Sequence, residues 1–182
     1  MPRRLLPAVL LSCALASNAM AGPMTEDFST APETRWDYVS DRVMGGVSDG
    51  QAAFVTDGGA TFVRLTGDVS TDNNGGFIQV RTRLTSKLPA DMTALRLRTR
   101  GNGEEYYVHI RTSDTRIPWF YYQAPFTAQA DWQDITIPLT AFAPSTAAIP
   151  QRIAAEKITS IGIVAYGRDH TADISVARIE SQ

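Results

Sequence analysis

The 182-residue sequence has one cysteine and two histidines, so it offers few groups for thiol, redox or zinc chemistry. The cysteine, Cys13, lies in an apolar stretch near the N-terminus, and a chain cut after Ala21 would contain none. Disulfide bonds and thiol catalysis would then be excluded, and zinc or iron would lack the ligands that they usually take in proteins. We therefore expect no redox or transition-metal cofactor.

Long apolar runs are also scarce. The strongest, residues 5–16, follows two arginines, is too short to cross a bilayer and is followed by small residues at 19–21. This order predicts a cleaved signal peptide over residues 1–21 and a periplasmic or secreted mature chain, with no later stretch of membrane length. Alternatively, Leu10-Leu11-Ser12-Cys13 resembles a lipoprotein attachment box, which would anchor the chain by lipid at Cys13.

Basic residues do not outnumber acidic ones, since the full chain has 17 Lys and Arg against 19 Asp and Glu, a net charge of −2. Removing residues 1–21 takes away two arginines and no acids, which leaves 15 basic against 19 acidic residues and a net charge of −4. Proteins that bind nucleic acid usually carry a basic excess, so we expect no nucleic-acid partner. Residues 22–182 are enough for a single domain with a full core.

Helix signals are few as well, since only residues 139–142 and 150–156 could form a turn or two. Elsewhere apolar and polar residues alternate with period two, the pattern of strands that bury one face. Asp57-Gly58-Gly59 and Gly101-Asn102-Gly103 predict tight hairpin turns. Many short strands with turns between them predict an all-β, antiparallel jelly-roll β-sandwich. The expected strands include residues 51–56, 60–67, 76–84, 104–113, 117–124, 132–138, 158–166 and 171–179.

The most specific stretch is residues 36–50, where aromatic, charged and glycine residues lie close together in the sequence. Trp36 is expected in the core, and Gly45 and Gly46 permit a tight turn. Asp41 and Arg42 are expected to form a buried ion pair that fixes the geometry of the loop. A functional corner built from the same two charges is the alternative.

Five segments follow one another in order over nearly all of residues 22–182: residues 40–48 with Trp36, residues 67–77, residues 106–112, residues 122–126 with Trp132, and residues 158–163. Together they resemble the complex I intermediate-associated protein 30 family. The resemblance implies a galactose-binding-like β-sandwich. It also implies kinship with a mitochondrial factor that helps to assemble respiratory complex I, the NADH:ubiquinone oxidoreductase.

Residues 46–50 match the G-x-S-x-G pattern of serine hydrolases, in which a strand-to-helix turn presents the serine to a histidine base. The residues that follow here alternate like a strand, so this context is missing. We expect Ser48 to hydrogen-bond its own backbone in a turn. No pair of acids can be placed together for acid–base catalysis either, so no catalytic residue is predicted.

Oxygen ligands for calcium occur in one glycine-flanked loop. Asp68, Asp72 and Asn73, with Asn74 beside them, offer carboxylate and amide oxygens, which Ca²⁺ accepts in flexible geometry. Asp and Asn are also ordinary turn residues, so a structural calcium site and a plain turn are both open.

The same alternation gathers polar and aromatic side chains on one expected surface, provided that the strands carrying them are neighbours. Arginine forks suit acidic or hydroxyl-rich ligands, and flat rings suit sugar faces or cations. A solvated outer face of an antiparallel sheet is the alternative. The expected surface comprises Gln79, Arg81, Arg83, Arg96, Arg98, Arg100, Tyr107, His109, Arg111, Trp119, Tyr121 and Gln123. The binding residues predicted within it are Arg81, Arg98, Tyr107, Arg111, Trp119 and Gln123.

These features predict a non-enzymatic, chaperone-like binding or assembly module that engages a protein partner in the cell envelope. The alternative is a carbohydrate-binding module whose arginines and rings line a groove for an envelope polysaccharide. Both hypotheses rest on analogy from family and fold to function.

Overall fold

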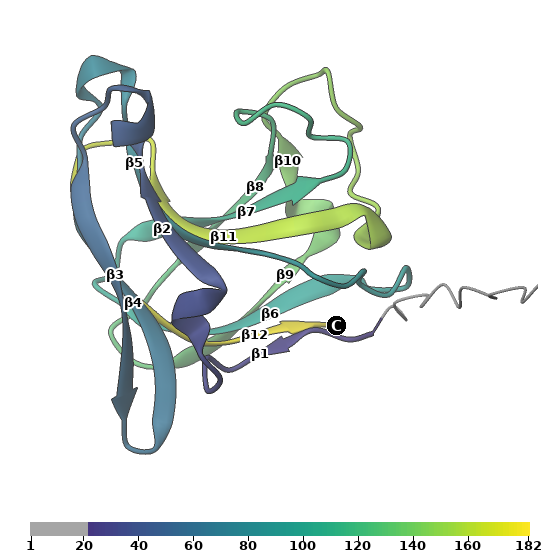
Figure 1. The fold of residues 1–182 in the computed structure, drawn as a ribbon, viewed down its shortest axis with the longest axis horizontal. Helices are drawn as coiled ribbons and strands as arrows, with labels where there is room; N and C mark the ends of the chain where they lie inside the picture. Colours follow the sequence, from purple (N-terminus) through teal and green to yellow (C-terminus); the bar gives the residue numbers. More distant parts are fainter. Residues whose placement is uncertain (1–21) are drawn as a thin grey trace, which may run out of the picture.

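The computed structural model describes residues 22–182, which form two six-stranded antiparallel sheets packed face to face (Figure 1). The all-β sandwich predicted from the sequence is therefore confirmed. Sheet A has the order β3-β4-β12-β6-β9, with β1 pairing β12 as well, and sheet B has the order β10-β8-β7-β11-β5-β2. The predicted signal peptide and the alternative lipid anchor at Cys13 lie outside the described residues. None of the helices in the described part is long and apolar enough to cross a membrane.

Each sheet takes strands from both halves of the chain, and short 3-10 turns connect several of them. The strands of sheet A are β1 (Thr25–Glu26), β3 (Asp49–Asp57), β4 (Ala60–Val69), β6 (Ala94–Gly101), β9 (Gln133–Pro138) and β12 (His170–Ser181). Those of sheet B are β2 (Trp36–Ser40), β5 (Phe77–Arg83), β7 (Glu105–Thr112), β8 (Tyr122–Thr127), β10 (Ala143–Pro144) and β11 (Ile158–Tyr166). The 3-10 turns are η1 (Pro32–Thr34), η2 (Asp41–Met44), η3 (Asp72–Asn74), η4 (Leu139–Ala141) and η5 (Ala155–Lys157).

One predicted hairpin is confirmed and another is wrong. β3 and β4 form a hairpin around Gly58 and Gly59, which have φ of 58° and 81°, conformations that glycine adopts without steric cost. The glycine turn at residues 101–103 also reverses the chain, but it leads from β6 in sheet A to β7 in sheet B. A turn sequence specifies a change of direction and does not specify whether the next strand pairs with the previous one.

The predicted strand at residues 117–124 begins later than expected, at Tyr122. Residues 117–121 form a loop, closed by a hydrogen bond from the Phe120 N–H to the Ile117 carbonyl (3.0 Å). Pro118 has no N–H to give to a neighbouring strand, which favours a loop at this point. Trp119 therefore lies on a loop, with 64% of its surface exposed.

The core lies between the two sheets and is built from the inward-facing members of each alternating strand, such as Leu95 and Leu97 of β6 and Ile161 and Ile163 of β11. Trp36 belongs to it, as predicted, and packs against Phe28 with ring centroids 5.3 Å apart. Its indole N–H donates to the buried Glu26 carboxylate (3.0 Å), so the polar edge of the ring is satisfied as well.

Candidate functional site

The family-like stretch forms a loop, residues 41–48, that is held by one buried carboxylate. Asp41 has no exposed surface, and it accepts hydrogen bonds from the backbone N–H groups of Ser48 (3.0 Å), Gly76 (2.6 Å) and Phe77 (3.2 Å) and from the Ser48 hydroxyl. Burial alone would raise the pKa of Asp41, but these hydrogen bonds outweigh it and hold the pKa below its usual range. The loop, which we call the signature loop, is thereby joined to the start of β5.

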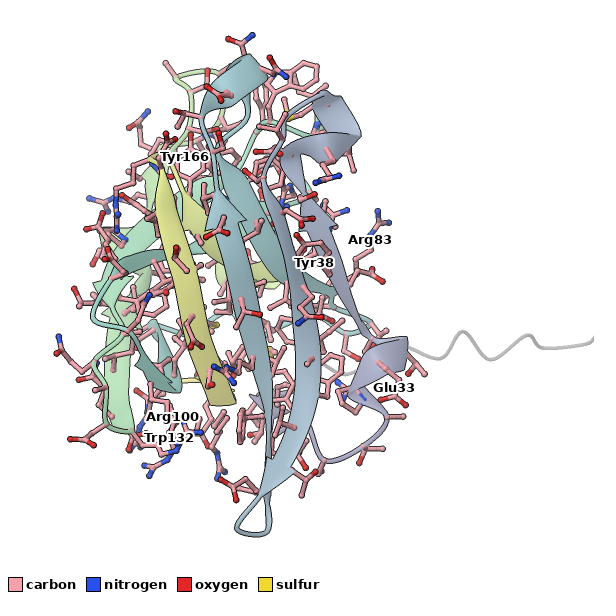
Figure 2. All side chains as sticks on the ribbon, turned by 90° about the vertical axis from the view of Figure 1, so that its left-hand side faces the viewer. Glu33, Tyr38, Arg83, Arg100, Trp132 and Tyr166 are labelled. Atoms are coloured by element: carbon pink, nitrogen blue, oxygen red, sulfur yellow. The ribbon has the colours of Figure 1, made fainter. Side chains whose placement is uncertain are left out.

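Glycine is required where the backbone approaches this carboxylate. A Cβ on Gly46 would lie 2.4 Å from the Asp41 carboxyl group, and one on Gly75 would lie 2.5 Å from it. Gly45 has φ of 93°, a left-handed conformation that closes the turn. The predicted tight turn at Gly45 and Gly46 is therefore present. Figure 2 shows the two turns that precede these glycines, η2 and η3, together at the upper end of the sandwich.

The predicted ion pair between Asp41 and Arg42 is wrong. Arg42 points outward, where its Nε donates to the Ser48 carbonyl (3.0 Å) and its guanidinium pairs with the exposed Asp49 (3.2 Å). Successive side chains of a 3-10 turn point in different directions, so Asp41 faces inward and Arg42 faces solvent. The charge of the buried carboxylate is stabilised by backbone N–H groups and the Ser48 hydroxyl, and not by an arginine.

Ser48 is fully buried, which excludes the exposed serine that a hydrolase elbow requires. Its hydroxyl donates to Asp41 and accepts from the Ser70 N–H (3.0 Å). The expectation that Ser48 bonds its own backbone is wrong, because the side chain joins the signature loop to the end of β4. The G-x-S-x-G match is a structural feature of this loop.

The outward side of the signature loop carries three apolar side chains besides Arg42. Val43, Met44 and Val47 are 76%, 62% and 43% exposed, and they are three of the five large hydrophobic side chains that are exposed among residues 22–182. The other two, Ile117 and Trp119, lie together on the loop that precedes β8. Exposed apolar groups gathered in a rigid loop are typical of contact sites.

The second candidate surface is the outer face of sheet B, the side turned away from sheet A, which is concave in Figure 1. The register places Arg81, Gly162, His109 and Gln123 in one row across β5, β11, β7 and β8. The adjacent row contains Gln79, Val164 and Tyr107. The sheet therefore brings together, across four strands, most of the side chains predicted to bind a ligand.

Four rings pack edge to face or stacked on this surface, and we call Tyr107, His109, Tyr121 and Tyr166 the aromatic cluster. His109 and Tyr121 are stacked with centroids 4.2 Å apart and planes 14° from parallel. Tyr166 meets His109 edge-on at 5.5 Å, and the Tyr121 hydroxyl donates to the Tyr166 hydroxyl (3.3 Å). Tyr107 packs on Tyr166 at 5.8 Å. The rings hold one another in place, which makes the cluster a preorganised surface.

Several buried polar atoms beneath the aromatic cluster have no hydrogen-bond partner among the described residues. His109 is only 5% exposed, and burial, followed by the charge of Arg111, lowers its pKa to about 3, so the ring is neutral at physiological pH. Its Nε2 has no hydrogen-bond partner within the described residues, and neither do the side-chain oxygens of Gln79 and Gln123. Gln79 lies against Gly162, where a Cβ would stand 3.3 Å from its Oε1. Buried polar atoms without a protein partner are available to hydrogen-bond a ligand.

Two arginines, Arg81 and Arg111, border the aromatic cluster. Neither forms an ion pair with any carboxylate in residues 22–182. Arg111 donates to the Pro118 carbonyl (3.0 Å) and its Cζ lies 5.8 Å from the Tyr121 ring centroid. Burial and the positive charge of Arg81 lower the pKa of Arg111. The two guanidinium groups therefore repel each other without a compensating acid.

The predicted single surface is wrong for Arg96, Arg98 and Arg100, because β6 belongs to sheet A and these residues lie on the opposite side of the sandwich from Arg81 and Arg111. There Arg96 and Arg98 share Asp134, at 2.9 Å and 3.7 Å. Arg100 stacks over the Trp132 ring at 4.7 Å, and Figure 2 shows this pair far from Tyr166. Of the predicted binding residues, Arg81, Tyr107, Arg111 and Gln123 share the outer face of sheet B. Trp119 lies on the loop beside it, and Arg98 does not belong to the group.

The predicted calcium ligands do not share one loop, because Asp68 lies in β4 and only Asp72 and Asn73 lie on the loop between β4 and β5. Asp68 accepts a hydrogen bond from the Thr171 hydroxyl (2.7 Å), and Asp72 and Asn73 form the turn η3, in which Asn73 has φ of 56°. Among the residues that the structure describes, no group of three or more His, Cys, Asp or Glu is placed to hold a metal ion. Calcium bound partly by amide or backbone oxygens stays a prediction.

Two residues of the outer face were not predicted as site residues, Tyr166 and Gly162. Both follow from the alternation of β11, in which Gly162, Val164 and Tyr166 fall on the side opposite Ile161 and Ile163. The signal was present in the sequence, but it indicates a face only when the strand is known to lie beside β5 and β7.

The fold resembles sugar-binding modules of known structure. It is similar to the family 11 carbohydrate-binding module of Clostridium thermocellum in complex with a β-1,3-1,4-mixed-linked tetrasaccharide, with a TM-score of 0.71 and 16% identity over 89% of this chain and 96% of that one. The family 11 module of a cellulosomal cellulase of the same bacterium gives 0.71 and 15%, over 89% and 95%. A family 30 carbohydrate-binding module gives 0.54 and 16%, over 75% and 92%. At such identities the likeness shows the fold alone.

A comparison with curated proteins found no match. The sequence does match the family described as Complex I intermediate-associated protein 30 over residues 26–176, from the end of β1 into β12. The match includes the signature loop and the whole aromatic cluster. On this evidence the chain belongs to the complex I intermediate-associated protein 30 family.

Proposed function

We propose that this chain is a non-enzymatic binding module that is exported to the cell envelope and engages a protein partner there, as an assembly factor does. The observation that carries the proposal is the signature loop, where exposed Val43, Met44 and Val47 stand on a backbone held by buried Asp41. The name of the family supports an assembly role, because it describes relatives associated with an intermediate of complex I.

Three exposed apolar side chains gain nothing in the free protein, whereas burying them against a partner would contribute roughly 25 cal/mol for each Å² of apolar area removed from water. The loop is already ordered by four hydrogen bonds to Asp41, so little conformational entropy would be lost on binding. We expect the partner to offer an apolar pocket that accepts Met44, whose flexible side chain adapts to irregular surfaces.

The side chains that could suggest catalysis are not accessible to a substrate. Ser48 is buried and hydrogen-bonded on both sides, and His109 lies under Tyr121, where a substrate could not reach it without displacing the ring. Export is supported by the order of basic, apolar and small residues over positions 1–21. N-terminal sequencing of the protein recovered from the envelope fraction should begin at Gly22, and an intact Met1 would contradict export by cleavage.

The partner test uses cross-linking in cells that produce the chain naturally. Three full-length tagged forms are compared: the natural sequence, the double variant Val43→Ser with Met44→Ser, and Ile117→Ser as a matched control at another exposed apolar position. We expect one envelope protein to cross-link to the natural chain and the control in equal yield, and to be lost with the double variant. Identical cross-links from all three forms would overturn the role of the loop.

A second candidate function, carbohydrate binding, is favoured by a separate observation. The aromatic cluster and its arginines lie on the concave outer face of a fold that resembles carbohydrate-binding modules, one of them solved in complex with a tetrasaccharide. Rings of fixed orientation with hydrogen-bonding groups between them suit a chain of sugars.

A further inference from the structure

The outer face of sheet B carries a charge that the rest of the fold does not balance. Most arginines on sheet A are paired with acids, as Arg64 is with Asp173 (2.7 Å) and Arg96 with Asp134 (2.9 Å), whereas Arg100 lies over the Trp132 ring. Arg81 and Arg111 form no such pair with any acid in the described part of the chain. This difference exists although acids outnumber bases in the whole sequence.

An acid does stand opposite one of these arginines in the register. Asp37 of β2 is the Cα partner of Arg81 in β5, yet their charged groups are not within ion-pair distance, and Asp37 is exposed. Glu105, at the start of β7, accepts a hydrogen bond from the Tyr107 hydroxyl (2.7 Å) instead of meeting an arginine. The positive charge of the face therefore remains available to a ligand.

The placement of the two arginines suits a carboxylate, which is flat and offers two oxygens. Arg81 and Arg111 lie on strands separated only by β11, where Gly162, which has no side chain, stands opposite Arg81 and Ser160 stands opposite Arg111. The Arg111 guanidinium is already oriented by its bond to the Pro118 carbonyl and by the Tyr121 ring. A guanidinium fork held in this way binds a carboxylate through two parallel hydrogen bonds.

The aromatic cluster beside the arginines supplies a surface for the ring that would carry such a carboxylate. Tyr121 and Tyr166 are locked by their mutual hydroxyl contact and by His109, so they offer ring faces and phenol groups without losing rotamer freedom. The unpartnered oxygens of Gln79 and Gln123 add acceptors for sugar hydroxyls once the amides turn toward a ligand.

From this combination we infer that the outer face of sheet B binds an acidic polysaccharide, with a uronic acid carboxylate held by Arg81 and Arg111 and the sugar rings lying on Tyr121 and Tyr166. The inference rests on the second candidate function, carbohydrate binding, and narrows it from sugars in general to polymers that carry carboxylates. It uses no residue of the signature loop.

The test measures the affinity of the purified full chain for polygalacturonate and alginate, two polymers of uronic acid, by calorimetry. Methyl-esterified polygalacturonate has the same backbone without the charge, and mixed-linkage β-glucan is a neutral polymer. We expect binding to at least one acidic polymer, a loss of about tenfold or more on esterification, and weakening as salt is raised.

The variants Arg81→Gln and Arg111→Gln should each weaken binding by about tenfold or more, while Arg96→Gln, on sheet A, should leave it unchanged. The thermal midpoint of each variant shows whether the fold is intact. If one variant fails to fold, esterification and salt still test the role of charge on the natural chain.

Two results would overturn the inference, and they separate it from the function on which it rests. Equal affinity for the ester and the acid would refute the carboxylate site but leave a carbohydrate-binding module in place. Absence of binding to every polymer would remove the acidic ligand and the carbohydrate function together, without touching the proposed protein partner.

Discussion

Replacing Asp41 with asparagine should cost this fold more stability than almost any other change of similar size. The carboxylate accepts four hydrogen bonds, three of them from backbone N–H groups. One carboxylate oxygen accepts three of these bonds, and the other accepts only from the Ser48 N–H. An asparagine side chain presents one oxygen, which would keep the first position, so its NH₂ group would face the Ser48 N–H. Each buried donor left without an acceptor costs about 1–3 kcal/mol. With one donor left unpaired and the other three bonds no longer made to a charged group, we expect Asp41→Asn to lower the free energy of unfolding by about 2–6 kcal/mol.

The size of this effect makes it easy to measure. Domains of this size usually unfold with about 5–15 kcal/mol and lose about 2–4 °C in Tm per kcal/mol. Urea denaturation of the natural chain and the variant should therefore show a midpoint shift, with a fall in Tm of about 5–20 °C. Asp49→Asn is the matched control, because Asp49 is exposed and pairs only with exposed Arg42. It should change stability by about 0.5 kcal/mol or less.

The same group should shape the acid limb of the stability curve. The pKa of Asp41 is lowered in the folded state, so its contribution is complete above the pKa of the unfolded chain and is lost as pH falls through the lower folded value. Asp41→Asn should therefore show a smaller loss of stability on acidification than the natural chain. A cost of less than about 1 kcal/mol at neutral pH would refute the argument that this carboxylate holds the loop.

Three further predictions concern single residues. Trp36→Ala should destabilise the fold by about 3–5 kcal/mol in urea titration, because a buried aromatic side chain is truncated and Glu26 loses a donor; a cost below 1 kcal/mol would contradict its place in the core. Gly46→Ala should lower the Tm, since its Cβ would lie 2.4 Å from the Asp41 carboxyl, and an unchanged Tm would show that the loop can move away. His109→Gln should flatten stability against pH below 6.5: the folded pKa is lowered to about 3, so the unfolded chain binds the proton first and the natural fold weakens as pH falls from 6.5. The same slope in variant and natural chain would mean that another group is responsible.

Much of the fold could be predicted from the sequence because alternation of period two reports which side of a strand is buried. It assigned Arg81, Tyr107 and Arg111 to outward positions correctly. It could not assign Arg98, because alternation says nothing of the sheet to which a strand belongs, and β6 lies in the other layer. The turn at residues 101–103 would look the same in either case.

The signature loop shows a second limit of sequence reasoning. The sequence suggested that neighbouring charges pair, but the partners of Asp41 are the backbone groups of Gly76 and Phe77, far along the chain. A backbone N–H carries no residue-type signal, so such a contact is invisible in composition or spacing. Only the glycines around the Asp41 carboxylate are visible in the sequence, because any side chain at their positions would collide with it.

The proposals of a glycan ligand and of a protein partner do not compete, because they concern different parts of the molecule. The fold supplies a concave sheet, and the side chains on it decide what binds. A glycan on the outer face of sheet B would contact Arg81 and Arg111, whereas a protein partner at the signature loop would contact Val43 and Met44. Since the two sets of residues share no member, variants of one set leave the other surface intact. A result at either surface therefore decides one proposal without rescuing or refuting the other.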